Sequence, residues 1–169
     1  MESRTAYRVV VIGVSAGGGE ALEALLPALP GDFPAPIVVV RHLHPHSEGS
    51  VTERLAGRCL LRIKQADEKE RLTPGTIYLA PANYHLLFEE DGTLALSLDP
   101  PVHYARPSID VTMESAVEAF GGAVLGVILT GANGDGAAGL SEVKAAGGYA
   151  VVQDPADASA LYVLMPMRV

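Results

Sequence analysis

The chain has 169 residues, of which 49% are hydrophobic and 18 are glycine. This length corresponds to one domain with a sizeable core, and the composition argues against disorder. The formal net charge of −8 disfavours a nucleic-acid partner, because a phosphate backbone would repel the chain. The single cysteine, Cys59, excludes an intrachain disulfide and a multi-cysteine metal site. We therefore expect a single domain over residues 1–169 in a reducing, cytoplasmic setting.

The first half of the chain alternates between expected strands and helices. Residues 8–13 form a continuous apolar, β-branched run, which is typical of a strand buried on both faces. The apolar run Val9–Val14 is too short to span a bilayer, so we expect no direct membrane insertion. A helix is expected over residues 20–29, a second strand over 36–40 and a second helix over 50–60. The alternation favours a parallel sheet with right-handed crossovers.

The middle of the chain has a different pattern. Short strands are expected at residues 76–79, 85–89 and 93–98. Asp91-Gly92, between the last two, is a strong signal for a hairpin turn. We interpret these segments as a short antiparallel extension of the sheet.

The last part of the chain returns to the alternating pattern. A helix is expected over residues 110–120, capped by Ser108 or by its own first residue. A buried strand at residues 124–129, a helix at 137–146 and a strand at 149–153 follow. Together the elements predict an α/β domain that is doubly wound around a mainly parallel sheet.

Three loops follow the carboxyl ends of buried strands, which is where sites form in such sheets. The first loop, Gly13–Gly17, matches the pattern Gly-x-Ser-x-Gly. A serine at a strand-to-helix turn can present its hydroxyl as a nucleophile, so Ser15 is a candidate. A serine that only caps the helix would give the same pattern, and this loop alone leaves both interpretations open.

The second loop, Arg41–His46, contains three alternating histidines. A histidine directly after a strand is a natural general base for a serine, which singles out His42. A solvated polar loop is the alternative. A zinc site would need three or four converging ligands, so we expect no metal here.

The third loop, residues 130–136, contains Asp135. Its carboxylate could orient a histidine, or it could form an Asx turn or a helix cap. Each of the three residues is ambiguous alone. Serine, histidine and aspartate after three strands of one parallel sheet favour acyl transfer.

These residues belong to a longer resemblance. The chain resembles the catalytic, C-terminal domain of the CheB chemoreceptor methylesterases over essentially its whole length. The resemblance rests on five ordered blocks: IGVSAGG at Ile12–Gly18, VVVRHLHP at Val38–Pro45, LTPGTIYLAP at Leu72–Pro81, RPSID at Arg106–Asp110, and GVILTGANGDGAAG at Gly126–Gly139.

The resemblance implies a serine esterase of bacterial chemotaxis adaptation. Its substrates would be glutamate γ-methyl esters on the cytoplasmic helices of chemoreceptors, and receptor glutamines could be deamidated by the same steps. It implies that Ser15 is the nucleophile, His42 the base and Asp135 the orienting acid. No cofactor is implied.

The resemblance also suggests supporting residues. Backbone N–H groups near Ala16 and Ala132 would form the oxyanion hole, and Arg106 with Asp110 would brace the site. The third loop departs from the family's usual Gly-Met-Gly-x-Asp-Gly, because its second glycine is displaced by one position. This departure puts the oxyanion donor in doubt and leaves a catalytically weak or inactive regulatory module as the alternative.

Two unrelated enzyme classes fit less well. In a dinucleotide-binding fold, Ser15 would occupy the place of the second fingerprint glycine. In an α/β-hydrolase the chain order is serine, acid, histidine, whereas here it is serine, histidine, acid. No receiver domain precedes the catalytic blocks, so we expect activity without a phosphodonor. The sequence does not determine the oligomeric state.

Overall fold

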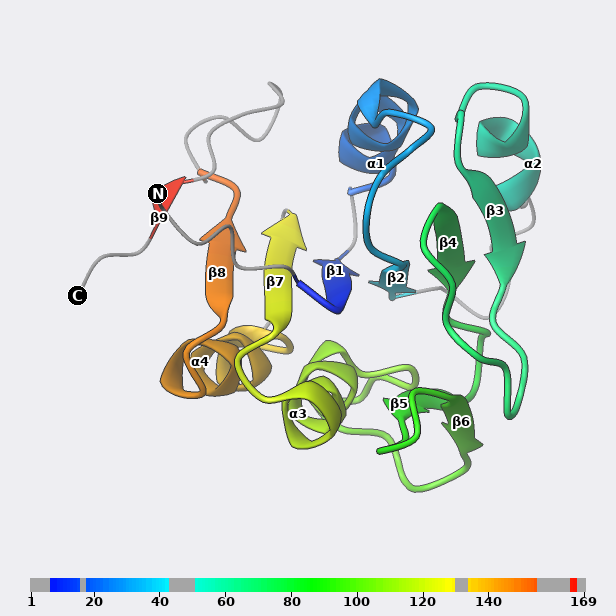
Figure 1. The fold of residues 1–169 in the computed structure, drawn as a ribbon. Helices are drawn as coiled ribbons and strands as arrows, with labels where there is room; N and C mark the ends of the chain where they lie inside the picture. Colours follow the sequence, from blue (N-terminus) through cyan, green and yellow to red (C-terminus); the bar gives the residue numbers. More distant parts are fainter. Residues whose placement is uncertain (1–6, 16–17, 43–50, 130–133, 155–164, 167–169) are drawn as a thin grey trace.

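The fold is described from a computed structural model of the chain. It describes residues 7–15, 18–42, 51–129, 134–154 and 165–166, and every structural statement below concerns these ranges. Figure 1 shows helices on both sides of one central sheet.

The central sheet is built mainly from parallel strands. Its strands are β1 (Val9–Val14), β2 (Ile37–Arg41), β3 (Arg62–Gln65), β4 (Thr76–Leu79), β7 (Val124–Leu129), β8 (Tyr149–Val152) and β9 (Met165–Pro166). They lie in the order β3-β4-β2-β1-β7-β8-β9, with only β9 antiparallel to its neighbour. The strand β1 therefore lies between β2 and β7, in the middle of the sheet.

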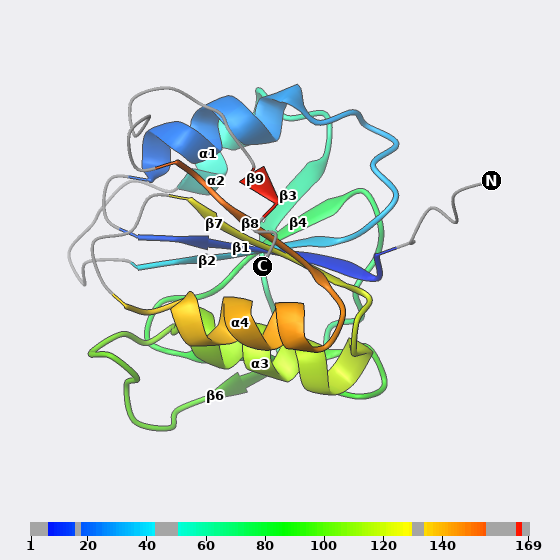
Figure 2. The same cartoon turned by 90° about the vertical axis from the view of Figure 1, so that its left-hand side faces the viewer.

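Helices cover both faces of the sheet, as Figures 1 and 2 show. One face carries α1 (Gly19–Leu25), which continues as the 3₁₀ turn η1 (Leu26–Ala28), and α2 (Val51–Ala56). The other face carries α3 (Ile109–Phe120) and α4 (Ala137–Ala145). This arrangement confirms the predicted doubly wound α/β fold.

The core has two halves because successive side chains of a strand point to opposite faces. Val9 and Val11 of β1 pack into the half that also contains Met113 of α3. Val10 and Ile12 pack into the half that contains Leu22 of α1. The strand is buried along its whole length, as its continuous apolar run predicted.

The predicted hairpin is present, but it is not hydrogen-bonded to the central sheet. Its strands β5 (His85–Phe88) and β6 (Leu94–Ser97) form a separate antiparallel pair. Side chains of α3 satisfy backbone groups of β5: Thr112 donates to the carbonyl of Leu86 at 2.7 Å, and Ser115 accepts from the N–H of Phe88 at 3.1 Å. Because the helix binds these groups, the hairpin packs on α3 and does not extend the sheet.

Other elements differ from expectation for local reasons. Residues 76–79, grouped with the hairpin in the sequence analysis, form β4, which runs parallel between β2 and β3. The strand β3 was not expected, because its sequence is polar and its side chains lie partly exposed at the sheet's edge. The helix α1 becomes a 3₁₀ turn at Leu26, one residue before Pro27, which cannot donate an N–H. In the described part of the chain, no helix is long and apolar enough to cross a membrane.

The helices α3 and α4 approach closely at Gly139. A Cβ atom on Gly139 would lie 2.7 Å from the Cβ of Met113 and 3.0 Å from the Cα of Asp110. Contacts this short force one helix to move away from the other.

We predict that Gly139→Ala lowers the free energy of unfolding. Overpacking costs about 1–3 kcal/mol, and the better helix propensity of alanine offsets up to about 1 kcal/mol of that. Urea denaturation measures the difference. Gly57→Ala is the matched control, because nothing lies within 4 Å of a Cβ there. Equal stability of the two variants would contradict the close packing.

Candidate active site

The site begins with Ser15 at the carboxyl end of β1. Ser15 directly follows Val14, the last residue of the strand, and it is buried, with 7% of its surface exposed. Its carbonyl accepts a hydrogen bond from the N–H of Gly18 at 3.1 Å, which closes the turn into α1. The serine thus lies at the strand-to-helix turn that the sequence predicted.

The neighbouring strand places His42 beside this turn. In the parallel pairing of β1 and β2, Val14 lies opposite Arg41, and the N–H of His42 donates to the carbonyl of Val14 at 3.1 Å. Ser15 and His42 are therefore the next residues along two hydrogen-bonded strands.

The side chain of His42 binds Asp135, which follows β7. Its Nε2 lies 2.6 Å from Oδ2 of Asp135, and the histidine side chain is only 15% exposed. Because β1 lies between β2 and β7, this contact passes over the end of β1, where Ser15 lies. The structure thus gathers the three sequence-predicted residues at one edge of the sheet.

The carboxylate of Asp135 is held by the first turn of α3. Its Oδ1 accepts from the hydroxyl of Ser108 at 2.7 Å and from the N–H of Asp110 at 3.0 Å. Its Oδ2 accepts from the N–H of Ile109 at 2.8 Å, in addition to His42. Burial alone would raise the pKa of Asp135, but these hydrogen bonds lower it to about 2. The group is therefore an anion at neutral pH.

The bond to Asp135 also fixes the tautomer of His42. An ionised carboxylate can only accept, so Nε2 must carry the proton. In the neutral ring, Nδ1 is then the basic nitrogen. The usual Ser-His-Asp arrangement has the opposite orientation, with Nδ1 bound to the acid and Nε2 facing the serine.

Asp110 makes the reciprocal connection to α4. Its Oδ1 accepts from the N–H of Gly136 at 2.9 Å and from the N–H of Gly139 at 2.7 Å. Gly136 has a φ of +108°, a conformation that glycine adopts without strain. Asp110 thus binds the start of α4 next to Asp135, while Asp135 binds the start of α3, on which Asp110 lies. The carboxylate of Asp135 thus offsets the positive N-terminus of α3, and the carboxylate of Asp110 offsets that of α4.

Arg106 has different partners. Its Nη1 donates to the carbonyls of Leu98 at 3.0 Å and Asp99 at 3.2 Å, so its described contacts are with the segment after β6 and not with Asp110. The direct Arg106–Asp110 pair considered in the sequence analysis is therefore not formed, because the guanidinium is turned toward backbone carbonyls.

The two residues expected near the oxyanion, Ala16 and Ala132, lie outside the described residues. Within the described ranges, no group of three or more histidine, cysteine, aspartate or glutamate side chains could hold a metal ion.

One buried residue near the site was not foreseen. His85, at the start of β5, is 1% exposed; its Nδ1 accepts from the N–H of Ser108 at 3.2 Å, and its Nε2 lies 3.0 Å from the carbonyl of Pro100. Because a backbone N–H occupies Nδ1, the proton is on Nε2, which donates to Pro100. His85 thereby fixes Ser108, which in turn binds Asp135. The sequence has no local signal for this contact, since it joins residues far apart in the chain.

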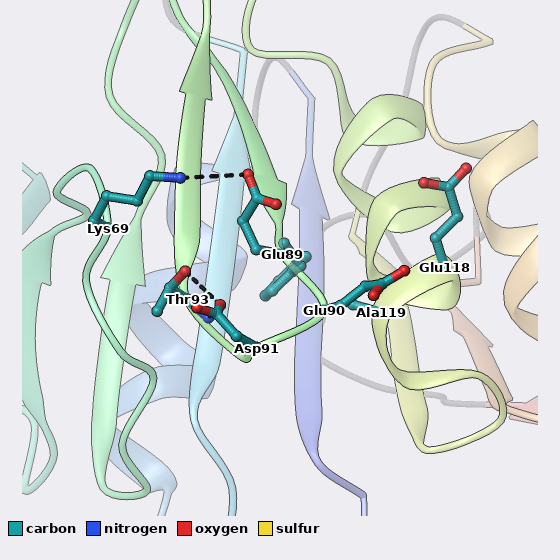
Figure 3. A pocket seen from close by; sticks show the side chains of 8 residues that line it. Lys69, Glu89, Glu90, Asp91, Thr93, Glu118 and Ala119 are labelled. Atoms are coloured by element: carbon teal, nitrogen blue, oxygen red, sulfur yellow. Dashed lines mark hydrogen bonds and ion pairs between the residues drawn. The ribbon is translucent and has the colours of Figure 1, made fainter.

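A separate cleft lies at the other end of α3. It has a volume of about 450 Å³, and four acidic side chains line it together with Lys69 (Figure 3). The acidic residues are Glu89, Glu90, Asp91 and Glu118. Glu118 is nine residues along α3 from Ile109, roughly 14 Å at 1.5 Å per residue. The cleft is therefore distinct from the group around Ser15.

Comparisons with known proteins identify the family of the chain. The family model described as CheB methylesterase matches residues 10–169. The chain belongs to the CheB methylesterase family. This membership confirms the resemblance seen in the sequence, and it is the family of a hydrolase.

Individual relatives are also named as methylesterases. A putative protein-glutamate methylesterase/protein-glutamine glutaminase of Leptospira interrogans is 49% identical over 160 residues, covering 95% of this chain and 82% of that protein. A protein-glutamate methylesterase/protein-glutamine glutaminase 1 of Burkholderia pseudomallei is 43% identical over 152 residues. The match covers 88% of this chain and 42% of that protein. This chain therefore spans less than half of that CheB relative.

A solved CheB structure has the same fold. The crystal structure of the Thermotoga maritima CheB methylesterase catalytic domain superposes with a TM-score of 0.85 at 35% identity. The match covers 92% of this chain and 84% of the Thermotoga chain.

We predict that Asp135 titrates far below an ordinary aspartate. NMR of its carboxyl carbon should give a pKa of about 2, against an ordinary value of 3.8. Because the folded pKa is the lower one, ionised Asp135 stabilises the fold above about pH 4, and this contribution is lost as the pH falls through about 2. In Asp135→Asn, the free energy of unfolding should therefore depend less on pH in this window. An unchanged pH slope would show that the carboxylate is not held as described.

Proposed function

We propose that this chain is a serine esterase that hydrolyses glutamate γ-methyl esters on the cytoplasmic helices of chemoreceptors. The observation that carries the proposal is the bond between His42 and Asp135, which crosses the end of β1 at Ser15. Membership in the CheB methylesterase family and the names of the relatives support the substrate. Deamidation of receptor glutamines would follow the same steps.

The proposed reaction is acyl transfer in two stages. Nδ1 of His42 takes the proton of the Ser15 hydroxyl as its oxygen attacks the ester carbonyl. Ionised Asp135 stabilises the imidazolium that forms. The imidazolium then protonates the departing methoxide, which leaves as methanol. A water molecule, activated by the same histidine, attacks the acyl-serine, releases glutamate and regenerates the serine. No cofactor or metal enters these steps.

Two groups complete the proposal. Backbone N–H groups at Ala16 and Ala132 would hold the oxyanion, as the family resemblance implies. Asp110 would act as a positioning residue, because its Oδ1 holds the N–H of Gly136 beside Asp135. We also propose that the chain works as a single catalytic domain in the cytoplasm, where the receptor helices are accessible.

We predict that Ser15→Ala lowers turnover by about 10⁴- to 10⁶-fold, as loss of a triad serine does in other hydrolases. Methanol release from a methylated receptor cytoplasmic fragment measures the rate. Ser141→Ala is the control, because Ser141 is exposed on α4 and its hydroxyl bonds only to the carbonyl of Ala137 among the described residues. Near-normal turnover in Ser15→Ala would exclude the serine mechanism. No turnover in the parent chain would favour the inactive regulatory module.

We predict that His42 alone among the three loop histidines is the base. His42→Gln should abolish turnover, because glutamine cannot accept the proton from Ser15. His44→Gln and His46→Gln, which lie outside the described residues, should retain it. The three variants are compared on the same receptor fragment, with circular dichroism to verify folding. A dead His44→Gln beside an active His42→Gln would reassign the base.

A further inference from the structure

An unusual turn lies between β6 and α3. Val102 and Ala105 exchange two backbone hydrogen bonds, of 3.0 and 2.9 Å, so that His103 and Tyr104 form a two-residue hairpin tip. Both tip residues have positive φ, +49° for His103 and +62° for Tyr104. Such tips normally carry Asn-Gly, because other side chains are strained in this conformation. This turn instead carries two bulky rings where small residues would fit more easily.

The turn presents an aromatic ring to solvent. Tyr104 is fully exposed, and it lies two residues before Arg106. The guanidinium of Arg106 donates to the carbonyl of Leu98, a residue that is 65% exposed. The backbone carbonyl of Arg106 accepts from the N–H of Asn83, and the next residue, Tyr84, is 38% exposed. Among the described residues, the other exposed large apolar side chains are Leu60 and Tyr149. Three of the five exposed large apolar side chains of the described residues, those of Tyr84, Leu98 and Tyr104, thus lie on segments that Arg106 joins. Such a grouping favours a binding surface.

The segment that carries the turn is held from several sides. Nη1 of Arg106 binds the carbonyls of Leu98 and Asp99, and His85 donates to the carbonyl of Pro100. The turn is therefore preorganised, and little conformational entropy would be lost when a partner binds it.

The turn also adjoins the proposed catalytic group. Nε2 of His103 lies 3.4 Å from Oδ2 of Asp110, within ion-pair range, although the geometry is not that of a hydrogen bond. The other oxygen of Asp110 binds Gly136, the residue after Asp135. Figure 2 shows the segment between β6 and α3 at the same left-hand edge as the ends of β1 and β2.

We propose that the His103–Tyr104 turn is a substrate-docking element, on which the receptor helix that carries the methylated glutamate rests. The ring of Tyr104 packs on the helix surface next to the ester, and Leu98 and Tyr84 extend this apolar contact. This inference rests on the proposed esterase function and adds a determinant of its specificity. It places helix recognition outside the residues that carry out the chemistry.

The test compares a macromolecular substrate with a small one. The first is the methylated cytoplasmic fragment of a chemoreceptor, and the second is N-acetyl-glutamate γ-methyl ester N-methylamide. Tyr104→Ala should lower kcat/KM on the receptor fragment by about tenfold, the usual effect of removing a central interface tyrosine, mainly through KM. Hydrolysis of the small ester should be unchanged. Tyr149→Ala is the matched control, because this exposed tyrosine lies at the start of β8, at the opposite edge of the sheet.

A second variant separates docking from folding. Tyr104→Gly keeps His103 and the turn and relieves the strain at position 104, so the protein should unfold at the same or a higher temperature. It should nevertheless lose receptor activity as Tyr104→Ala does.

Each outcome decides the inference. Unchanged kcat/KM on the receptor fragment in both variants would overturn it, and so would an equal loss on both substrates, because the turn would then act on the catalytic group. If the unaltered chain hydrolyses neither ester, the proposed function itself fails and the inference falls with it. That result is distinguishable, because it appears before any turn variant is measured.

Discussion

Two buried carboxylates hold the candidate site together. Asp135 accepts the first N–H groups of α3, and Asp110, on α3, accepts the first N–H groups of α4. Both side chains are nearly fully removed from water, which would be costly for unpaired charges. The N–H groups at the two helix N-termini, which have no partner within their own helix, bind the carboxylates and compensate for the lost hydration. Removing Asp135 would leave the start of α3 without this partner, and removing Asp110 would do the same to the start of α4. The first turns of the two helices therefore depend on this pair of carboxylates.

This exchange gives Asp135 two simultaneous roles. The sequence left open whether the residue orients a histidine or caps a helix, and the geometry supports both, although the helix is α3 and not its own. The hydrogen bonds from α3 keep the carboxylate ionised, and the fourth bond goes to His42. Stability and the proposed chemistry therefore share one group. Substitutions of Asp135 should affect both, which makes Ser15 the cleaner probe of catalysis.

The sheet places Ser15, His42 and Asp135 after three neighbouring strands, at one edge. The chain leaves β1 toward α1 on one face and leaves β7 toward α4 on the other, so the loops separate at the carboxyl ends of neighbouring strands. Sites form at such points in open parallel sheets. The hairpin packs against α3 and is followed by the segment that contains the His103–Tyr104 turn. In this way an element outside the sheet brings the proposed docking surface to the same edge.

Much of this protein was determined by local sequence. The apolar runs of β1, β2 and β7 are typical of buried strands, and the loops after them indicated the edge at which Ser15, His42 and Asp135 lie. Tertiary structure decided what local patterns do not encode. The polar edge strand β3, the docking of the hairpin on α3, the turning of Arg106 away from Asp110 and the role of His85 all depend on partners distant in sequence. A hydrogen bond or an ion pair is made by whichever group folding brings within about 3 Å, and no periodicity records that choice.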